Sequence, residues 1–464
     1  MKILLVNPPP YEIVEPHFDT PSYPRTALAF LAGALRANSI DVSVLDCKFD
    51  RVPHDKAVKR ICQLSPDIIG YTAQTNEIVQ AGRLAEDVKK RLPFSKHIIG
   101  GVHASILPER TLREFEAFDY ACLGEGEATI VEFVQHIKIN GIDILPASVK
   151  GIAYLDETNN YVFTGEREKI GTGSKSLDCI PLPSWDMFRK ASLYLLHTQR
   201  GCPYHCPFCV NPNGRLIRKE SPERVVEQVK ELYEKYECSN ISFGDEIFTL
   251  DRNRVMAICE GLVQCNLHKK VKWQCTTHIN CIDEDMALAM KKAGCIKVGL
   301  GIESGDPQKL QEINKGTSIE KIMEVAAGLK RSKLPFNSFF ILGQPNETEE
   351  SARKTIELAV KINADVPIFG IMVPYPGTKI GEMAERGAGG YILNTNSWND
   401  YNKQIGNAVE FAGVSRNTLE RLQLIGYLSV FIENRRFLDL LKFCWSYRKI
   451  GFAVLKRILF KTKP

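Results

Sequence analysis

Residues 201–210 read GCPYHCPFCV and place Cys202, Cys206 and Cys209 within a span of eight residues. A structural zinc site ordinarily has four ligands in paired C-x2-C knuckles, so the spacing C-x3-C-x2-C fits zinc poorly. A cubane iron-sulfur cluster has four irons, and three thiolates leave one of them open to another ligand. Three incidental cysteines are the alternative, because the chain has 14 cysteines in all. The spacing favours an iron-sulfur cluster with one open iron.

The triplet follows the first of several short apolar runs that alternate with amphipathic stretches. The run before it is LLHTQR, and the later ones are NISFGD, VKWQCTTH, IKVGLG, FNSFFILG and PIFGIMVP. About six β/α units of this kind predict a partial (β/α)6 barrel of the TIM type over residues 195–384. From about residue 385 the strand pattern is lost, and we expect a small helical C-terminal region over residues 385–464.

Residues 1–145 show a similar alternation, with KILLVN, VSVLD, DIIGYTA, HIIGG and YACLG as the apolar runs. This α/β pattern predicts a doubly wound parallel sheet of the Rossmann-like type. The Pro-rich residues 146–194 predict a hairpin-bearing linker between the two domains. Ligands of open α/β sheets bind at the carboxyl ends of the strands. Loop signals stand at four such ends, namely Asn7-Pro8, Thr72 to Asn76, Gly100-Gly101-Val102-His103 and Gly124-Glu125-Gly126-Glu127.

Length and composition indicate a soluble globular chain. The 464 residues are 44% hydrophobic and 25% charged, which suits about three domains. No apolar stretch reaches the roughly 18 residues needed to cross a bilayer, and no signal peptide is expected. Fourteen cysteines without a secretory signal favour a reducing compartment, so we expect a cytoplasmic protein.

The net charge of +5 is unevenly distributed along the chain. Residues 435–464 hold nine Lys and Arg residues against Asp439, a charge of +8, which leaves −3 for residues 1–434. This asymmetry indicates a basic tail and not a basic nucleic-acid-binding body, so no nucleic acid partner is expected. The tail interleaves apolar and basic residues at helical spacing, which predicts peripheral contact with an anionic membrane. The alternative is that its apolar face packs against the barrel.

The triplet, with aromatic Phe208 before its last cysteine, resembles the signature of the radical S-adenosylmethionine (SAM) superfamily. The resemblance implies that Cys202, Cys206 and Cys209 bind a 4Fe-4S cluster and that the amino and carboxylate groups of SAM chelate the open iron. One electron from an external reductant of the flavodoxin or ferredoxin type cleaves SAM. The resulting 5′-deoxyadenosyl radical abstracts hydrogen from the substrate. Phe208 is expected to pack near the adenine.

Later strand ends resemble further SAM contacts of the superfamily. Gly244-Asp245-Glu246 resembles the motif that meets the SAM ammonium group, for which carboxylates are suitable acceptors. Glu303 resembles a polar SAM contact, and Gly343 and residues 374–378 (PYPGT) resemble loops that line the same mouth. Asp245 and Glu303 could instead cap helices, and the glycines could simply turn the chain. His278 stands where relatives often carry arginine, and it is assigned no role.

The segments NPPP, GGVHAS and GEGE resemble the cobalamin-binding domain of cobalamin-dependent radical SAM enzymes, and the resemblance then covers roughly residues 1–380. The cobalamin contacts that it implies are Asn7, Pro8, Thr72, Asn76, Gly100, Gly101, His103, Gly124, Glu125 and Gly126. The motif D-x-H-x-x-G, whose histidine ligates cobalt, is absent, since Asp46-Cys47-Lys48 is the nearest match and has no histidine. This fits the radical SAM branch. His103 is expected near the cofactor tail and not on the cobalt, and ordinary α/β turns are the alternative for the Gly-rich loops.

The resemblance implies an enzyme with a 4Fe-4S cluster, SAM and cobalamin that methylates an unactivated carbon of a small-molecule or lipid-like substrate. One SAM would methylate the cobalamin and a second would yield the radical, so both cofactors must face one cavity. Cobalamin-dependent cyclisation, ring rearrangement or oxidation is the first alternative, and a non-enzymatic cobalamin sensor is the second. A tRNA methylthiotransferase fits less well, because Cys47, Cys62 and Cys122 do not match the spacing of its second cluster.

Overall fold

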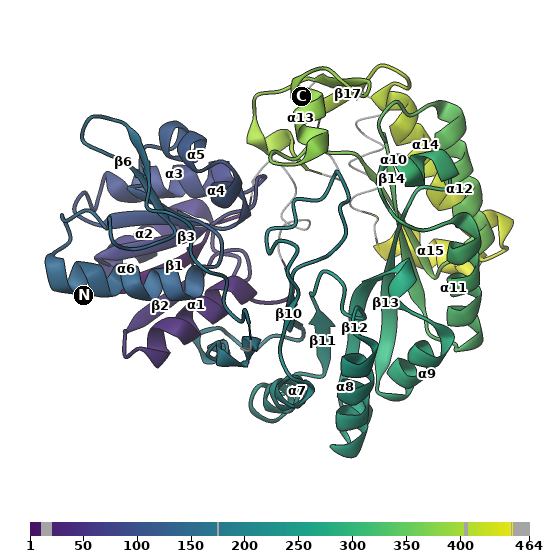
Figure 1. The fold of residues 1–464 in the computed structure, drawn as a ribbon, viewed down its shortest axis with the longest axis horizontal. Helices are drawn as coiled ribbons and strands as arrows, with labels where there is room; N and C mark the ends of the chain where they lie inside the picture. The colour runs from purple at the N-terminus through teal and green to yellow at the C-terminus, as the bar shows by residue number, and fades with distance from the viewer. Residues whose placement is uncertain (11–20, 174–175, 403–406, 447, 449–464) are drawn as a thin grey trace.

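The computed structural model describes residues 1–10, 21–173, 176–402, 407–446 and 448. Two α/β units lie side by side, the first drawn in purple and blue and the second in teal and green (Figure 1). Each is built around its own sheet, and connecting loops run between them. The fold class predicted from the sequence, a doubly wound sheet followed by a partial barrel, is confirmed.

The first sheet has seven strands in the order β2-β1-β3-β4-β5-β6-β7. Its strands are β1 (Ile3–Asn7), β2 (Val42–Asp46), β3 (Ile68–Thr72), β4 (Lys96–Gly100), β5 (Tyr120–Cys122), β6 (Ile152–Leu155) and β7 (Tyr161–Phe163). Strands β1 to β5 are parallel, whereas β6 pairs antiparallel with β5, and β7 with β6. The hairpin expected within residues 146–194 is therefore the edge of this sheet.

Helices cover both faces of the first sheet, as the doubly wound pattern requires. They are α1 (Thr26–Ala37), α2 (His54–Leu64), α3 (Ile78–Lys89), α4 (Val102–Ile106), α5 (Pro108–Glu114) and α6 (Gly126–Asn140). Alternate residues of the buried strands pack on the two faces of the sheet, because successive side chains of a strand point to opposite faces. Leu4 and Val6 of β1 join a core with α2 and α3, whereas Ile3 and Leu5 join a core with α1 and α6.

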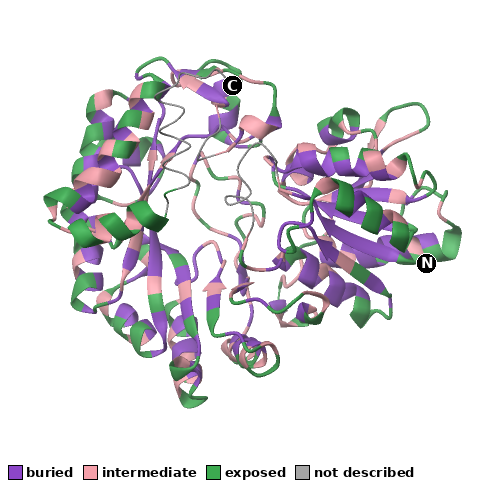
Figure 2. Cartoon of the chain, turned by 180° about the vertical axis from the view of Figure 1, so that it is seen from behind, coloured by how far each residue is buried: buried purple, intermediate pink, exposed green. Residues whose placement is uncertain are grey.

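The second sheet has six strands, all parallel, in the order β15-β14-β13-β12-β11-β8. They are β8 (Tyr194–Leu196), β11 (Asn240–Phe243), β12 (Lys272–His278), β13 (Cys295–Glu303), β14 (Phe336–Leu342) and β15 (Val366–Ile371). The helices of this unit are α7 (Pro222–Tyr236), α8 (Arg252–Gln264), α9 (Glu284–Lys292), α10 (Pro307–Glu312), α11 (Ile319–Arg331) and α12 (Glu349–Ile362). Their inner faces are buried against the strands and their outer faces are exposed (Figure 2).

Most barrel helices begin where a short polar side chain caps the first turn. Such side chains accept hydrogen bonds from backbone N–H groups that have no partner within the helix. The capping residues are Ser221, Asp251, Asp283, Asp306, Ser318 and Thr348. These caps fix the start of each helix, and so the length of each loop that leaves a strand at the carboxyl end of the sheet.

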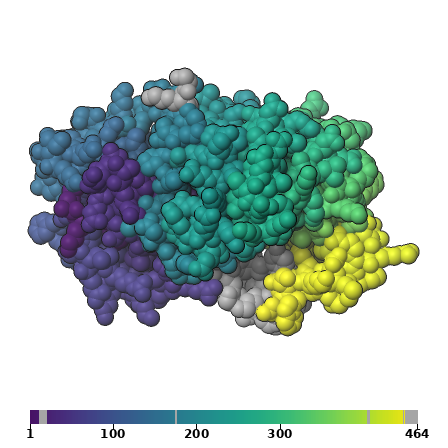
Figure 3. Space-filling model, turned by 90° about the horizontal axis from the view of Figure 1, so that it is seen from below, coloured from purple at the N-terminus to yellow at the C-terminus, as the bar shows by residue number. Residues whose placement is uncertain are grey.

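The C-terminal region contains α13 (Lys379–Glu385), α14 (Arg416–Glu433) and α15 (Phe437–Ser446). The expectation of loops and helices alone was wrong here, since β16 (Tyr391–Leu393) and β17 (Val409–Phe411) form an antiparallel hairpin. Strands of three residues are too short to show alternation. The chain's yellow end lies at the surface beside the barrel (Figure 3). Residues 447 and 449–464 of the predicted basic tail lie outside the described residues.

No helix among the described residues has both the length and the apolar character needed to span a membrane.

Candidate functional site

The three cysteines lie on a loop, residues 201–217, that leaves and re-enters the barrel at one point. The short strands β9 (Gln199–Arg200) and β10 (Arg218–Lys219) flank it and pair antiparallel, with Arg200 opposite Arg218. Inside the loop, the Cys202 N–H donates to the Gly214 carbonyl at 3.0 Å. The Asn211 side-chain amide donates to the Cys202 carbonyl at 3.1 Å. We call residues 201–217 the cysteine loop.

A ring stack and a backbone hydrogen bond hold the cysteine loop against the barrel. The Tyr204 ring stacks on the His278 ring with the centroids 3.8 Å apart. On the other side, the Ile380 N–H at the start of α13 donates to the Pro207 carbonyl at 3.1 Å. His278 is itself fixed, because its Nε2 lies 2.9 Å from the Lys315 carbonyl oxygen. The structure thus shows that His278 supports the cysteine loop. Its position in the sequence gave no indication of this role.

The thiols suit an iron-sulfur cluster as donors. All three cysteines are free, with Cys202 and Cys206 half-buried and Cys209 exposed. Burial raises the pKa of the Cys206 thiol to about 11, against the opposing effect of Lys315, so a metal is needed to hold it as a thiolate. In the described part of the chain no three His, Cys, Asp or Glu side chains converge on a single metal ion. Thiolates on a cubane each bind a different iron, so a separated triplet is compatible with it.

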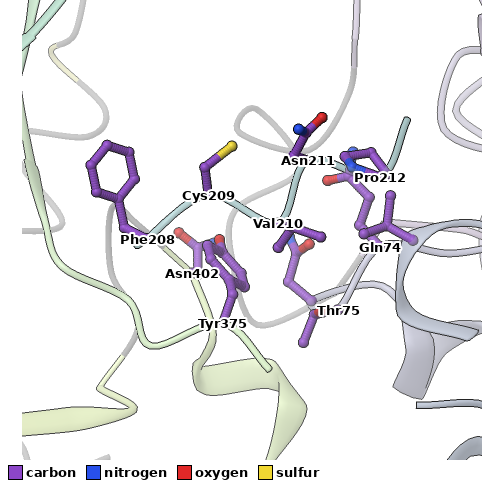
Figure 4. Close-up of a pocket in the computed structure, with 11 residues that line it drawn as sticks. Gln74, Thr75, Phe208, Cys209, Val210, Asn211, Pro212, Tyr375 and Asn402 are labelled. Carbon is purple, nitrogen blue, oxygen red and sulfur yellow. The ribbon is translucent and has the colours of Figure 1, made fainter. Parts of the chain in front are cut away.

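A cavity of about 490 Å³ lies between the two domains beside the cysteine loop. Residues of the cysteine loop line one side, and the loop after β3 lines another (Figure 4). The lining residues are Gln74, Thr75, Asn76, Val102, Phe208, Cys209, Val210, Asn211, Pro212, Tyr375 and Asn402. Predicted residues of both cofactor sites, Phe208 and Cys209 on one side and Asn76 on the other, thus meet at one cavity.

The two carboxylates after β11 have different surroundings. Asp245 is buried, and its carboxylate accepts from the Thr198 N–H, the Thr198 hydroxyl and the Gln199 N–H at 2.6 to 3.0 Å. Glu246 accepts from the Asn213 amide of the cysteine loop at 2.6 Å, and its other oxygen is buried without a partner in the described structure. A buried carboxylate oxygen without a donor is costly. A cation such as the SAM ammonium group would satisfy it.

Glu303 lies at the end of β13 with a left-handed backbone, φ +73°. Non-glycine residues seldom adopt this conformation, and it often marks functional sites. Its carboxylate accepts from the Lys315 ammonium at 3.0 Å, and both side chains are largely buried. Lys315 is therefore a second charged group beside the cysteine loop. No signal in the sequence distinguished it from the other lysines.

The strand-end loops of the first sheet leave room for a bulky cofactor. Gly101 has φ +98°, and a Cβ there would lie 2.6 Å from the Ala73 carbonyl oxygen, so only glycine allows this close approach. A Cβ at Gly124 would meet no atom within 4 Å, so the space beside it is open. Asn7 donates to Asp46 at 2.7 Å, while its side-chain oxygen is buried without a partner among the described residues. An open, glycine-lined edge with an orphan polar atom fits cobalamin.

A buried ion triad that sequence reasoning missed supports the loop after β3. Glu77 pairs with Lys48 at 2.7 Å and with Arg25 at 3.1 Å, and it accepts from the Gln74 N–H at 2.7 Å. Burial alone would raise the pKa of Glu77, but the two cations lower it to about 2. The carboxylate therefore stays charged and holds Gln74, which lines the cavity. The three residues are far apart in sequence, so only folding brings them together.

His103 does not line the cavity, whereas its neighbour Val102 does. The His103 ring is buried, packs edge-on against Trp398 at 4.8 Å, and has no hydrogen-bond partner at either nitrogen in the described structure. Trp398 donates to Glu114 at 2.6 Å, which fixes this C-terminal segment on the first domain. His103 thus packs at a domain contact.

The predicted GEGE residues make contacts between the domains. Glu125 lies 2.5 Å from Arg218 and 3.4 Å from Arg200, and Glu127 accepts a hydrogen bond from Arg200. The expectation that Glu125 contacts cobalamin stays a prediction beside these ion pairs.

Comparison with known proteins identifies both halves of the chain. Residues 196–359 match the model of the radical SAM superfamily, and residues 21–134 match that of the B12 binding domain. An uncharacterized methyltransferase of Pyrococcus horikoshii is 31% identical over 93% of each chain. The chain belongs to the cobalamin-binding radical SAM family. It is therefore an enzyme whose cofactors are a 4Fe-4S cluster, SAM and cobalamin. Like radical SAM enzymes in general, it acts on a small molecule and needs a reductant.

More distant relatives also match the chain, and a solved structure shares its fold. The anaerobic magnesium-protoporphyrin IX monomethyl ester cyclase of Cereibacter sphaeroides is 28% identical over 77% of this chain and 60% of its own. The fold is similar to that of the radical SAM methyltransferase TsrM from Kitasatospora setae, solved with cobalamin and a 4Fe-4S cluster bound. The TM-score is 0.74 at 17% identity, over 92% of this chain and 88% of that one.

The His103 environment predicts a specific pH dependence of stability. Burial lowers the pKa of His103 to about 4, so the unfolded chain takes up this proton at a higher pH than the folded chain does. Stability should therefore fall as the pH drops below about 6.5. His103→Phe keeps a ring against Trp398 and should reduce the loss of unfolding free energy between pH 7 and 5 by about 2 kcal/mol. Denaturant unfolding of the cobalamin-free protein measures this.

The matched control is His136→Asn, which changes a half-buried histidine of α6 and should leave the pH dependence unchanged. If His103→Phe loses as much stability as the wild type over the same pH range, His103 is not buried as a neutral ring.

Proposed function

We propose that the enzyme transfers a methyl group from SAM, by way of cobalamin, to an unactivated carbon of a small-molecule substrate. The observation that carries this proposal is the single cavity lined both by the cysteine loop and by the strand-end loop of the B12-binding domain. A methyl carrier and a radical source must reach the same carbon, because a substrate radical has to meet the methyl group before it reacts elsewhere. The Pyrococcus relative that is named a methyltransferase supports the same reaction.

Each group at the site has a role under this proposal. When bound, the cluster with SAM supplies a radical that removes hydrogen, and cobalamin supplies the methyl group. Cys202, Cys206 and Cys209 hold the cluster, and the unpaired oxygen of Glu246 accepts from the SAM ammonium group. Glu303, which pairs with Lys315, stays a proposed polar contact of SAM. The cobalamin contacts Asn7, Pro8, Thr72, Asn76, Gly100, Gly101, His103, Gly124, Glu125 and Gly126 stay proposals.

The cavity wall indicates the kind of substrate that it takes. None of the described lining residues is Asp, Glu, Lys or Arg. Val102, Phe208, Val210 and Pro212 make part of the wall apolar, and amides such as Asn402 supply neutral polar groups. An uncharged, partly apolar group should enter without leaving buried charges unpaired. We therefore retain a small-molecule or lipid-like substrate as the proposal.

Radical cyclisation is the second candidate reaction. It rests on the similarity to the Cereibacter protein, which is named a cyclase. The two reactions differ in their by-products, because methylation through cobalamin consumes one SAM as a methyl donor and another as a radical source. Only methylation gives S-adenosylhomocysteine along with 5′-deoxyadenosine.

We propose a working division of the chain at the predicted boundaries. It assigns residues 1–145 to the cobalamin-binding domain, 146–194 to the linker, 195–384 to the radical SAM core and 385–464 to the C-terminal region. The pairing of β6 with β5 supports including the hairpin with the first sheet in any truncated variant. A flavodoxin or ferredoxin is the proposed electron donor, and a cytoplasmic location stays a prediction from cysteine use.

Helix α15 supports the proposal of peripheral membrane contact. Phe437, Leu438, Leu441 and Trp445 are 57 to 74% exposed on one side of the helix, whereas Phe443 packs on Tyr427 with the ring centroids 5.2 Å apart. Lys442 is 79% exposed on the same helix. An apolar stripe flanked by cations is typical of a helix that lies on an anionic membrane. The basic residues beyond Arg448 lie outside the described chain.

The product pattern tests the reaction. The anaerobically reconstituted enzyme is given reductant, a cell extract and SAM with a deuterated methyl group. We expect it to form 5′-deoxyadenosine and S-adenosylhomocysteine. We also expect it to transfer the deuterated methyl group to a metabolite of the extract. Mass spectrometry of the products and of the extract measures all three. The deoxyadenosine without S-adenosylhomocysteine or label would instead favour cyclisation.

The cluster assignment has its own variant. Cys206→Ala should abolish 5′-deoxyadenosine formation and reduce bound iron, whereas Cys265→Ala removes an exposed cysteine of the barrel and should change neither. Full iron content and activity in Cys206→Ala would show that the Cys206 thiol does not bind the cluster.

Glu246→Gln tests the ammonium contact. Loss of a charge-assisted hydrogen bond from a buried carboxylate should weaken SAM binding by about 10- to 100-fold. Equilibrium binding of SAM to the reconstituted enzyme measures it, with Glu260→Gln on the exposed face of α8 as the control. An unchanged dissociation constant in Glu246→Gln would show that the orphan oxygen does not meet SAM.

Liposome flotation tests the membrane contact. We expect binding to anionic vesicles that weakens with salt and is lost in the double variant Leu441→Glu/Trp445→Glu, because both side chains are exposed. Leu288→Glu, at an exposed position of α9, is the control. No binding of the wild type to anionic vesicles at low salt would rule the contact out.

A further inference from the structure

The two arginines at the ends of the cysteine loop have side chains that extend from the barrel to the first domain. Arg200 and Arg218 are register partners in the β9–β10 pair, so they stand at the two ends of the loop. The loop is tight at this point, because a Cβ at Gly201 would lie 2.2 Å from the Leu216 carbonyl oxygen. A shift of the backbone at Arg200 or Arg218 would therefore move an end of the cysteine loop.

Two glutamates of the first domain receive these arginines. Arg218 Nη2 lies 2.5 Å from Glu125 Oε1, and Arg200 Nη1 lies 3.4 Å from Glu125 Oε2. Arg200 also donates to Glu127. The four side chains are only 1 to 12% exposed, and their charges sum to zero. We call these four residues the interdomain ion cluster.

The glutamates are held firmly on their own side. Glu125 is the N-cap of α6, and Glu127 is in its first turn, where a negative charge is favourable. Glu125 Oε2 accepts from the Ile170 N–H at 3.1 Å. The positions of Glu125 and Glu127 are therefore fixed relative to the first domain.

Other contacts between the two units reach different parts of the barrel. The Thr26 hydroxyl donates to the Leu195 carbonyl at 2.9 Å and so holds strand β8. The exposed pair Arg36–Asp186, at 2.6 Å, holds the linker. The interdomain ion cluster is buried and charged, and it ends on Arg200 and Arg218, which flank the cysteine loop.

We propose that the interdomain ion cluster positions the cysteine loop against the cobalamin-binding domain, so that radical formation and methyl transfer take place at one substrate carbon. Its members are positioning residues, since their buried side chains pair with one another across the two domains. The coupling of the two reactions rests on the proposed function, whereas the control of loop position does not. Removal of one charge leaves a buried net charge, because the four charges no longer cancel, which destabilises the arrangement more than the loss of an exposed pair does.

The test compares Glu127→Gln with the wild-type holoenzyme, both reconstituted anaerobically with cluster and cobalamin. Hydrogen exchange of the amides in residues 201–217 should be faster by about ten-fold in the variant, because the loop opens more easily. The yield of methylated product per 5′-deoxyadenosine should fall by about ten-fold, since small displacements of reacting groups strongly reduce transfer. Deoxyadenosine formation itself should stay within about two-fold.

Arg36→Gln is the matched control, because it breaks an interdomain pair whose side chains are 48 and 54% exposed. It should change neither readout. Wild-type exchange over residues 201–217 in Glu127→Gln would overturn the proposal. If the wild type forms no methylated product, the proposed reaction is wrong, but the exchange measurement still decides the role of the ion cluster.

A fold defect in Glu127→Gln would appear as a lower melting temperature with loss of both cofactors. Arg200→Lys then decides, because it keeps the charge but loses the planar fork that meets two glutamates. Faster exchange of the cysteine loop by a few-fold supports the proposal, and unchanged exchange in this folded variant contradicts it.

Discussion

The antiparallel pairing of Arg200 with Arg218 brings both ends of the cysteine loop to one place, and the rest of the site depends on it. A local spacing of three cysteines supplies donors but not a position. The pairing turns the spacing into a closed loop that Tyr204 and Pro207 then fix to the barrel. The same two arginine side chains meet the first domain, so one structural element serves the cluster, the barrel and the domain contact.

Buried charge is handled in two ways in this protein. Glu77, with Arg25 and Lys48, and Glu125, with Arg200 and Arg218, have cations beside them, which offsets the cost of burial. Glu246 differs, because it has no ion pair among the described residues and one of its oxygens is buried without a hydrogen-bond partner there. Compensated carboxylates hold loops in place, whereas an uncompensated one indicates where a ligand cation binds.

Sequence reasoning succeeded where the signal is local or periodic. The alternation of apolar runs predicted both sheets, and the cysteine spacing predicted the cluster type. It missed the β16–β17 hairpin, whose strands are too short for a period to show. Adjacent candidates also could not be separated: Asp245 is satisfied by Thr198 and Gln199, and Val102 lines the cavity where His103 packs on Trp398. Such differences depend on which way a side chain points at a strand end.

The sequence by itself determined the chemistry that the chain can host, because donor type, spacing and hydrophobic period are properties of neighbouring residues. Only the tertiary structure decided how the two halves act together. Residues near positions 75, 210 and 375 line the cavity, and the interdomain ion cluster joins Glu125 to Arg218. Contacts between residues so far apart leave no trace in a single sequence, since they follow from how two separately folded sheets pack against each other.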